Sequence, residues 1–168
     1  MSTRPAPDAE ARAESLKERI YVTFTSLAVV LTLQSHASET TPGQAAITLL
    51  IAVVGTLLAV FVADLLSHLT VHAKLPTAPE LRHMIGVSIG SIGVVVLPMV
   101  FLLLAQLDVW SIEAAIQAAV VVLIATLAFV GFLAVRRITL PFWQKAVVLL
   151  AEVVLGLAVI GLELLAHG

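Results

Sequence analysis

The chain has 168 residues, of which 60% are hydrophobic and 12% are charged, with a formal net charge of -2. The polar side chains are too few to cover the surface of a water-soluble globule of this length. The composition therefore indicates a membrane protein whose main partner is the lipid bilayer. The lack of cysteine excludes disulfides and thiol-based metal or nucleophilic sites, and the balanced charge gives no reason to expect a nucleic-acid partner.

Residues 1–19 form a short polar N-terminal segment in which Pro5 and Pro7 precede a mixture of acidic and basic side chains. We expect a disordered tip, followed by a solvated or interface-lying helix that leads into the first membrane span.

Five apolar segments make up the rest of the chain, residues 20–168. Each reaches the length needed to cross a hydrocarbon core of ~30 Å, the first only if its flanking polar residues are counted. The sequence therefore predicts an all-α, polytopic membrane protein, a bundle of five transmembrane helices. The expected spans are about 20–38, 42–74, 78–107, 111–135 and 141–167.

The first span has an alternative interpretation as a cleaved signal peptide, because Ser35, His36 and Ala37 offer a small-x-small cleavage site after a short apolar run. The region before that run is as acidic as it is basic, whereas a signal peptide begins with a positively charged region. We therefore expect residues 20–38 to be a retained span.

The helix starts are marked by capping residues. Thr41 and Gln44 have the spacing of a capping box, and Thr77 with Glu80 repeats it. Ser111 is the candidate cap of the fourth span. These signals predict where the second, third and fourth spans begin.

The basic residues predict the orientation. If the amino terminus is cytoplasmic, all nine Lys and Arg residues fall in the inner segments 1–19, 67–83 and 136–145. Because cytoplasmic loops carry an excess of Lys and Arg, we expect a multi-pass protein of the plasma membrane with its N-terminus cytoplasmic and its C-terminus outside.

Asp64, His68 and His72 follow one another at intervals of four residues where the second span leaves the membrane on the inner side. A solvated helix end is the simplest interpretation. The three side chains spread over roughly 12 Å of helix, so at most two neighbours can share one metal ion, and His83 joins them only if the loop folds back. We therefore expect no metal site and no cofactor.

Residues 58–68 and 157–167 share an order of residue types: an acid, two leucines, a small residue and a histidine. In so apolar a chain chance explains most of this similarity. The alternative is an inverted repeat of the kind from which many transporters are built. Either way, Asp64 and His68 mark the inner boundary, and Glu163 and His167 mark the outer one.

Glu152 is the residue that an apolar span should not contain. It lies seven to nine residues beyond Trp143 and Lys145, roughly 10 to 14 Å into the fifth span. A carboxylate at that depth has to be protonated or paired, and such residues mark ion or proton pathways by default. A protonated Glu152 that joins two helices by one hydrogen bond is the structural alternative. Its expected polar neighbours are Thr23, Thr25, Ser26, Ser88 and Ser91.

Small residues predict close helix packing. Gly86, Gly90 and Gly93 give the third span a small-xxx-small face, and alanines do the same for the fourth. Such Gly and Ala faces also suit a homo-oligomer or a partner membrane subunit.

We therefore interpret the chain as a non-enzymatic carrier or channel for protons or a small cation, with Glu152 as the central titrating group. The pathway residues that we expect are Glu152, Asp64, His68, Glu163, His167, Ser88 and Ser91. A non-catalytic subunit or scaffold of a larger membrane complex is the first alternative. An intramembrane metalloenzyme is the second, but its ligands would have to converge at one depth, whereas the histidines divide between the two faces.

Overall fold

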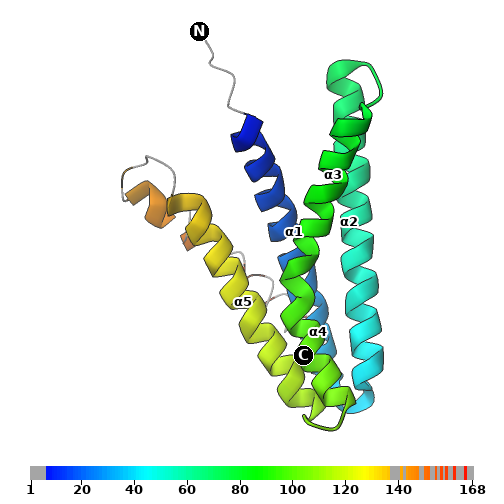
Figure 1. Cartoon of the computed structure of the whole chain (residues 1–168). Coiled ribbons are helices and arrows are strands. Elements are labelled where there is room, and N and C mark those ends of the chain that lie inside the picture. The colour runs from blue at the N-terminus through cyan, green and yellow to red at the C-terminus, as the bar shows by residue number, and fades with distance from the viewer. Residues whose placement is uncertain are drawn as a thin grey trace.

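The computed structural model describes residues 7–136, 141, 143–147, 150, 151, 154, 156, 158, 161 and 165. Within these residues the fold is all-helical and contains no strand (Figure 1), as the sequence predicts. The elements are α1 Pro7–Ser35, the 3-10 turn η1 Ala37–Glu39, α2 Pro42–His72, α3 Ala78–Ser91, the 3-10 turn η2 Ile92–Val95, α4 Val96–Gln106 and α5 Ile112–Arg136. Residues 143–147, within the fifth expected span, are also helical.

Within the residues that the structure describes, three stretches of helix are long and apolar enough to cross a membrane: Pro42–His72, Ala78–Gln106 and Ile112–Arg136. The shortest of them, with 25 residues, has a length of roughly 38 Å at 1.5 Å per residue, which exceeds a hydrocarbon core of ~30 Å. The first expected span, 20–38, is not among them. Its hydroxyl-bearing and amide side chains, such as Thr23, Ser26 and Gln34, dilute its apolar character.

Helix α1 is nevertheless the central helix of the described bundle. It packs against α2, α3 and α5, and Figure 1 shows it running between α5 on one side and the α2–α3 pair on the other. Val22 and Leu27 are completely buried, and so are the polar side chains of Thr23 and Ser26. The least apolar helix is thus shielded by its more apolar neighbours, which is the favourable arrangement for polar groups in a lipid environment.

The described part of the polar N-terminal segment is helical, as expected, but it is not solvated at every position. Residues 7–19 are helical and continue into the apolar part of α1 without a break. Within this segment Glu18 is only 2% exposed. A solvated helix is therefore the wrong description at Glu18, because α2 and α3 extend beyond the apolar part of α1 and cover this turn.

The predicted helix starts are confirmed. The Thr41 amide donates to Gln44 Oε1 at 3.1 Å and the Gln44 amide donates to Thr41 Oγ1 at 3.3 Å, which completes a capping box. The Thr77 amide donates to Glu80 Oε2 at 2.7 Å. The Ala114 amide donates to Ser111 Oγ at 3.2 Å. Each of these bonds satisfies an amide or hydroxyl at a helix start that has no intrahelical partner.

The third predicted span is not one continuous helix. It divides into α3 and α4, which are joined by the 3-10 turn Ile92–Val95. Proline has no amide hydrogen and its ring clashes with the carbonyl four residues earlier, so Pro98 removes the regular helical bond to Val94. The tighter turn just before Pro98 follows from this lost bond.

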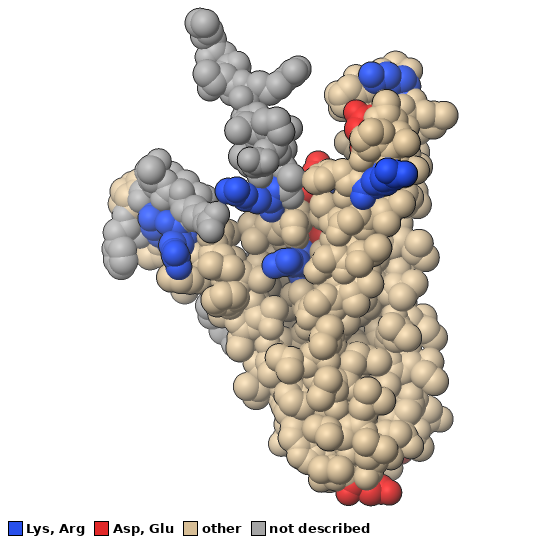
Figure 2. Space-filling view, viewed as in Figure 1, with Lys and Arg blue, Asp and Glu red and all other residues tan. Residues whose placement is uncertain are grey.

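The charged side chains divide between the two ends of the bundle. Figure 2 shows Lys and Arg gathered at one end, whereas the opposite tip carries acidic side chains. We name the first the basic end; it holds the N-terminal part of α1 and the α2–α3 turn. The acidic end holds η1 and the α4–α5 turn, with Glu39, Asp108 and Glu113.

The glycines of α3 and η2 do not support close packing inside the described part of the chain. A methyl group placed on Gly86, Gly90 or Gly93 would meet no atom within 4 Å. The alanines of α5 were expected to pack, and two of them do: Ala115 and Ala119 are completely buried in the core, whereas Ala114 is exposed. The glycine face of α3 is therefore directed outward, and the alanine face of α5 inward.

Candidate functional site

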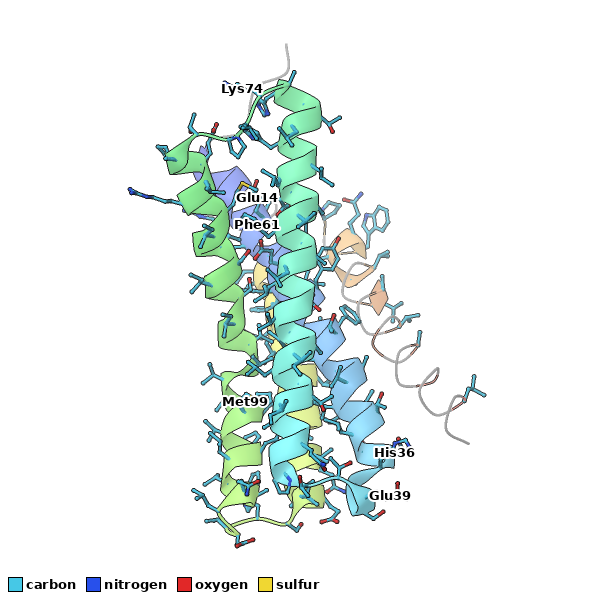
Figure 3. All side chains as sticks on the ribbon, turned by 90° about the vertical axis from the view of Figure 1, so that its right-hand side faces the viewer. Glu14, His36, Glu39, Phe61, Lys74 and Met99 are labelled. Carbon is cyan, nitrogen blue, oxygen red and sulfur yellow. The ribbon has the colours of Figure 1, made fainter. Side chains whose placement is uncertain are left out.

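A polar pocket opens at the basic end, between α1, α2 and α3. Its volume is about 640 Å³. Figure 3 shows the labelled Glu14 in this region, below the turn that carries Lys74. The lining residues are Glu14, Lys17 and Glu18 from α1, Asp64, Ser67, His68, Val71 and His72 from α2, and Pro79, Glu80, His83, Met84 and Val87 from α3.

Lys17 and Asp64 form an ion pair that joins α1 to α2 at this pocket. Lys17 Nζ donates to Asp64 Oδ1 at 2.7 Å, the short distance expected of a charge-assisted hydrogen bond. The two side chains are 40% and 26% exposed, so water screens the pair in part. The hydrogen bond to Asp64 raises the pKa of Lys17 above the ordinary lysine value, although burial opposes the rise.

Glu18 lies at the closed side of the pocket and joins α1 to α3. Ser88 Oγ donates to Glu18 Oε1 at 3.1 Å, and Ser91 Oγ lies 3.3 Å from Glu18 Oε2. Glu18 precedes the apolar part of α1 and is outside the three candidate spans. Burial raises the pKa of Glu18, and the hydrogen bonds from the two serines oppose only part of that rise.

The geometry around Ser91 suits a protonated Glu18. Ser91 Oγ is also 3.2 Å from the Val87 carbonyl oxygen, so its single proton has two acceptors to serve. When Glu18 is ionised, either Glu18 Oε2 or the Val87 carbonyl oxygen is without the hydrogen bond from the Ser91 hydroxyl. When Glu18 is protonated, its own O–H donates to Ser91 Oγ while Ser91 donates to Val87. Both protonation states thus have a hydrogen-bonded arrangement, so the serines do not fix the charge of Glu18.

Three histidines share the pocket. The rings of His68 and His72 stack with their centroids 4.4 Å apart, and His83 Nε2 lies 3.4 Å from Glu14 Oε2. The α2–α3 turn thus folds back and brings His83 to the other two. Among the residues that the structure describes, no group of three or more His, Asp or Glu side chains is placed to hold a metal ion. His68 Nε2 is buried and has no hydrogen-bond partner there.

The structure gathers part of the predicted pathway at the basic end. Asp64 and His68 line the pocket, and Ser88 and Ser91 contact Glu18, which lines it too. Glu152, Glu163 and His167 lie outside the described residues. The two serines that were expected near Glu152 are hydrogen-bonded to Glu18.

Glu18 was missed from the sequence alone, because the buried face of the first helix was assumed to begin only with the apolar run at residue 20. Val22, Ser26 and Val30 recur every four residues and are all buried. One step of four back from Val22 along this face is Glu18, and another is Glu14. Extending the helical periodicity into the polar segment would have placed both carboxyls on the side that faces α2 and α3.

Polar side chains continue from Glu18 into the bundle for a short distance. Thr23 Oγ1 donates to the Arg19 carbonyl oxygen at 2.6 Å. Ser26 is completely buried, and its hydroxyl has no hydrogen-bond partner among the described residues. Ser26 lies two helical turns beyond Glu18, roughly 12 Å along α1. Beyond Ser26 the buried side chains of α1 are apolar, as at Leu27 and Val30.

This arrangement can accept a cation among its carboxylates, and it can take up and release a proton at Glu18. No family model, curated protein or solved structure matches the chain. The geometry of the pocket is therefore the basis for the functional conclusion.

Proposed function

We propose that this chain is a small membrane carrier or channel for protons or a small cation, and that Glu18 is the titrating group of its inner half. One observation carries this proposal: a carboxyl that is 2% exposed closes an open polar pocket, and its hydrogen bonds come from uncharged serine hydroxyls. A fully buried carboxylate is usually paired with a cationic side chain. Because its hydrogen bonds come from neutral hydroxyl groups, Glu18 can gain or lose a proton without leaving an unpaired cation in the pocket.

The three bilayer-length helices supply the setting for this role. If the basic end is cytoplasmic, as the positive-inside rule indicates, the protein is a multi-pass protein of the plasma membrane and the pocket opens to the cytoplasm. Glu152 then remains the central group of the proposed pathway, and Glu163 and His167 belong to its outer end.

Proton and cation flux in proteoliposomes tests the proposal. Glu18→Gln keeps the shape and the serine contacts but removes the titrating group, so we expect the flux to fall by about tenfold or more. Glu39→Gln is the matched control, because Glu39 is an exposed acid at the opposite end. Circular dichroism and size-exclusion chromatography show whether each variant is folded. Undiminished flux in folded Glu18→Gln protein, or no flux under any gradient, overturns the proposal.

Glu152→Gln tests the central part of the pathway separately. We expect this variant to lose flux as well, because both carboxyls are placed on one pathway in the proposal. If Glu18→Gln abolishes flux and Glu152→Gln leaves it unchanged, the pathway does not include Glu152.

A second function, that of a non-catalytic subunit of a larger membrane complex, is favoured by the outward glycines of α3 and η2. Gly86, Gly90 and Gly93 leave open space where another backbone can approach. Purification in a mild detergent tests this role. A stoichiometric partner that is lost in Gly90→Leu supports the subunit, and recovery of the chain alone from its native membrane excludes it.

A further inference from the structure

The size of the polar pocket bears on what it binds. About 640 Å³ lies within the range of roughly 300 to 1,000 Å³ that is typical of sites for small organic molecules, and it is far larger than a bare ion requires. Part of the lining is apolar and comes from Val71, Pro79, Met84 and Val87. This mixture of polar and apolar walls fits a molecule that has a charged group and a hydrocarbon part.

The charge of the lining selects a cation. Four carboxylates face a single ammonium group, and they come from all three helices. The carboxylates are Glu14, Glu18, Asp64 and Glu80, and the ammonium group belongs to Lys17. A charged ligand that enters this lining gains most if it is positive, because the carboxylates outnumber the ammonium group; Glu18 is shielded from water and Asp64 is shielded in part.

Lys17 shows which kind of cation the lining accepts. Its side chain is itself an alkylammonium ion, and Nζ donates to Asp64 Oδ1 at 2.7 Å. The pocket thus already holds one organic ammonium group on one of its carboxylates. A second carboxylate, that of Glu18, accepts hydrogen bonds from serine hydroxyls and from no other side chain among the described residues.

We infer that the polar pocket binds an organic ammonium ion with N–H donors, held between Glu18 and Asp64 with its hydrocarbon part against the apolar wall. This inference rests on the proposed function and names the substrate class of the same site. The bound ion takes the position of a proton at Glu18 and competes with the ammonium group of Lys17 for Asp64. Lys17 is accordingly a specificity-determining residue, which weakens binding of any cation unable to displace it.

The N–H donors are part of the inference. The carboxylates and serine oxygens are hydrogen-bond acceptors, and a quaternary ammonium ion offers them charge without a donor. Among the described residues, His68 Nε2 is buried and has no hydrogen-bond partner. In the neutral tautomer that lacks a proton at Nε2, this nitrogen can accept an N–H from a ligand once the His68 ring moves away from the stacked His72 ring. Binding should therefore discriminate between two ions of the same shape and charge that differ only in N–H groups.

Isothermal titration of the full chain in detergent tests this discrimination. The probes are benzylammonium, benzyltrimethylammonium and plain ammonium chloride. We expect benzylammonium to bind at least about tenfold more tightly than either of the others. Glu18→Gln and Asp64→Asn should each weaken benzylammonium binding by about tenfold, whereas Glu39→Gln at the acidic end should leave it unchanged. Lys17→Met should tighten it several-fold, since the internal competitor is gone.

Each result separates the inference from the proposed function. The inference is overturned if all three probes bind equally, or if neither Glu18→Gln nor Asp64→Asn changes benzylammonium binding. The proposed function is then tested by the proton flux alone. Specific benzylammonium binding without any flux in proteoliposomes supports the binding site and overturns the transport function. If Glu18→Gln does not fold, the inference is still tested by Asp64→Asn, which should weaken benzylammonium binding, and by Lys17→Met, which should tighten it. Weaker binding in Lys17→Met contradicts the proposed competition.

Discussion

The two ends of this bundle are held together in different ways. Toward the acidic end, apolar side chains from α1, α2, α4 and α5 close the interior, and Leu27, Leu49, Leu102 and Ile116 are at most 1% exposed. Toward the basic end the helices separate, as Figure 1 shows, and α1 is connected to α2 and α3 by charged and hydroxyl side chains. An apolar core accepts many sequences of similar volume, whereas each buried polar group needs its own partner.

Helix α1 contributes to both regions with one face. Val22 and Val30 pack in the closed core, and Glu14 and Glu18 continue the same face into the polar pocket. The rigid core thus fixes the position of the pocket carboxyls, while the open end leaves room for a ligand. Variants in the two regions should therefore differ in what they disturb.

The largest effect on stability is expected in the closed core. Leu123 of α5 is completely buried, and Leu123→Ala leaves a cavity. Within a membrane the transfer from water contributes nothing between helices, so the loss is that of packing, about 2 kcal/mol. Val121→Ala on the exposed face of the same helix, where Val121 is 65% exposed, should cost far less. Unfolding in detergent measures both, and equal losses would contradict the packing of α5 against this core.

The next effect concerns Glu18 and depends on pH. Because the pKa of Glu18 is raised in the folded protein, the folded chain binds a proton more tightly than the unfolded one. Stability therefore falls as pH increases from the ordinary carboxyl value to the raised one, and it stays constant above that. Glu18→Gln should remove this decline and stabilise the protein by about 1 kcal/mol at neutral pH. Thermal unfolding between pH 4 and pH 8 measures it, and parallel curves for the two proteins would show that Glu18 is not the group that titrates.

Much of the closed region could be predicted from the sequence. Apolar content and capping residues such as Thr41 and Ser111 predicted helical segments and their starts, because these depend on local chemistry alone. The break before Pro98 was missed, although proline carried the relevant information. The outward direction of Gly86 and Gly90 was not predictable, since which face meets a neighbour depends on the packing of the whole bundle.

The polar pocket was predictable only in part. Asp64 and His68 stand out because charged and imidazole groups are rare in this chain, but Glu18 is concealed among many charged residues of the N-terminal segment. Its partners are 70 and 73 residues away in the chain. No local pattern reports such a contact. The partners of Glu152 cannot be compared, because Glu152 lies outside the described residues.

A smaller effect is expected from the ion pair at the pocket. Lys17→Met should cost about 0.5 to 1 kcal/mol at neutral pH, because both partners are partly exposed and screened. The pKa of Lys17 is raised in the folded protein, so the stabilisation is fully present below the ordinary lysine value and is lost as pH increases through the raised one. Exchanging the two charges, Lys17→Asp with Asp64→Lys, should recover part of the loss. Salt should weaken the native pair, and a loss independent of salt would identify a packing role of the lysine stem instead.

The smallest effect is expected at the turn that closes the basic end. Helix α2 ends where Ala73 adopts a left-handed backbone with φ 50°, and its amide donates to the Leu69 carbonyl oxygen at 2.8 Å. An L-residue pays about 1 kcal/mol for this conformation and glycine does not, but glycine also gains freedom in the unfolded chain. Ala73→Gly should therefore stabilise the protein by only a few tenths of a kcal/mol.

Ala59 is the matched control for this change, because it is an exposed alanine inside α2. Ala59→Gly should destabilise by about 1 kcal/mol, since glycine weakens a helix interior. Opposite signs in thermal unfolding show that the left-handed end of α2 is formed in the folded protein. Destabilisation by both variants would mean that the helix continues past Ala73, and the α2–α3 turn would then place His83 and Glu80 elsewhere than in the pocket.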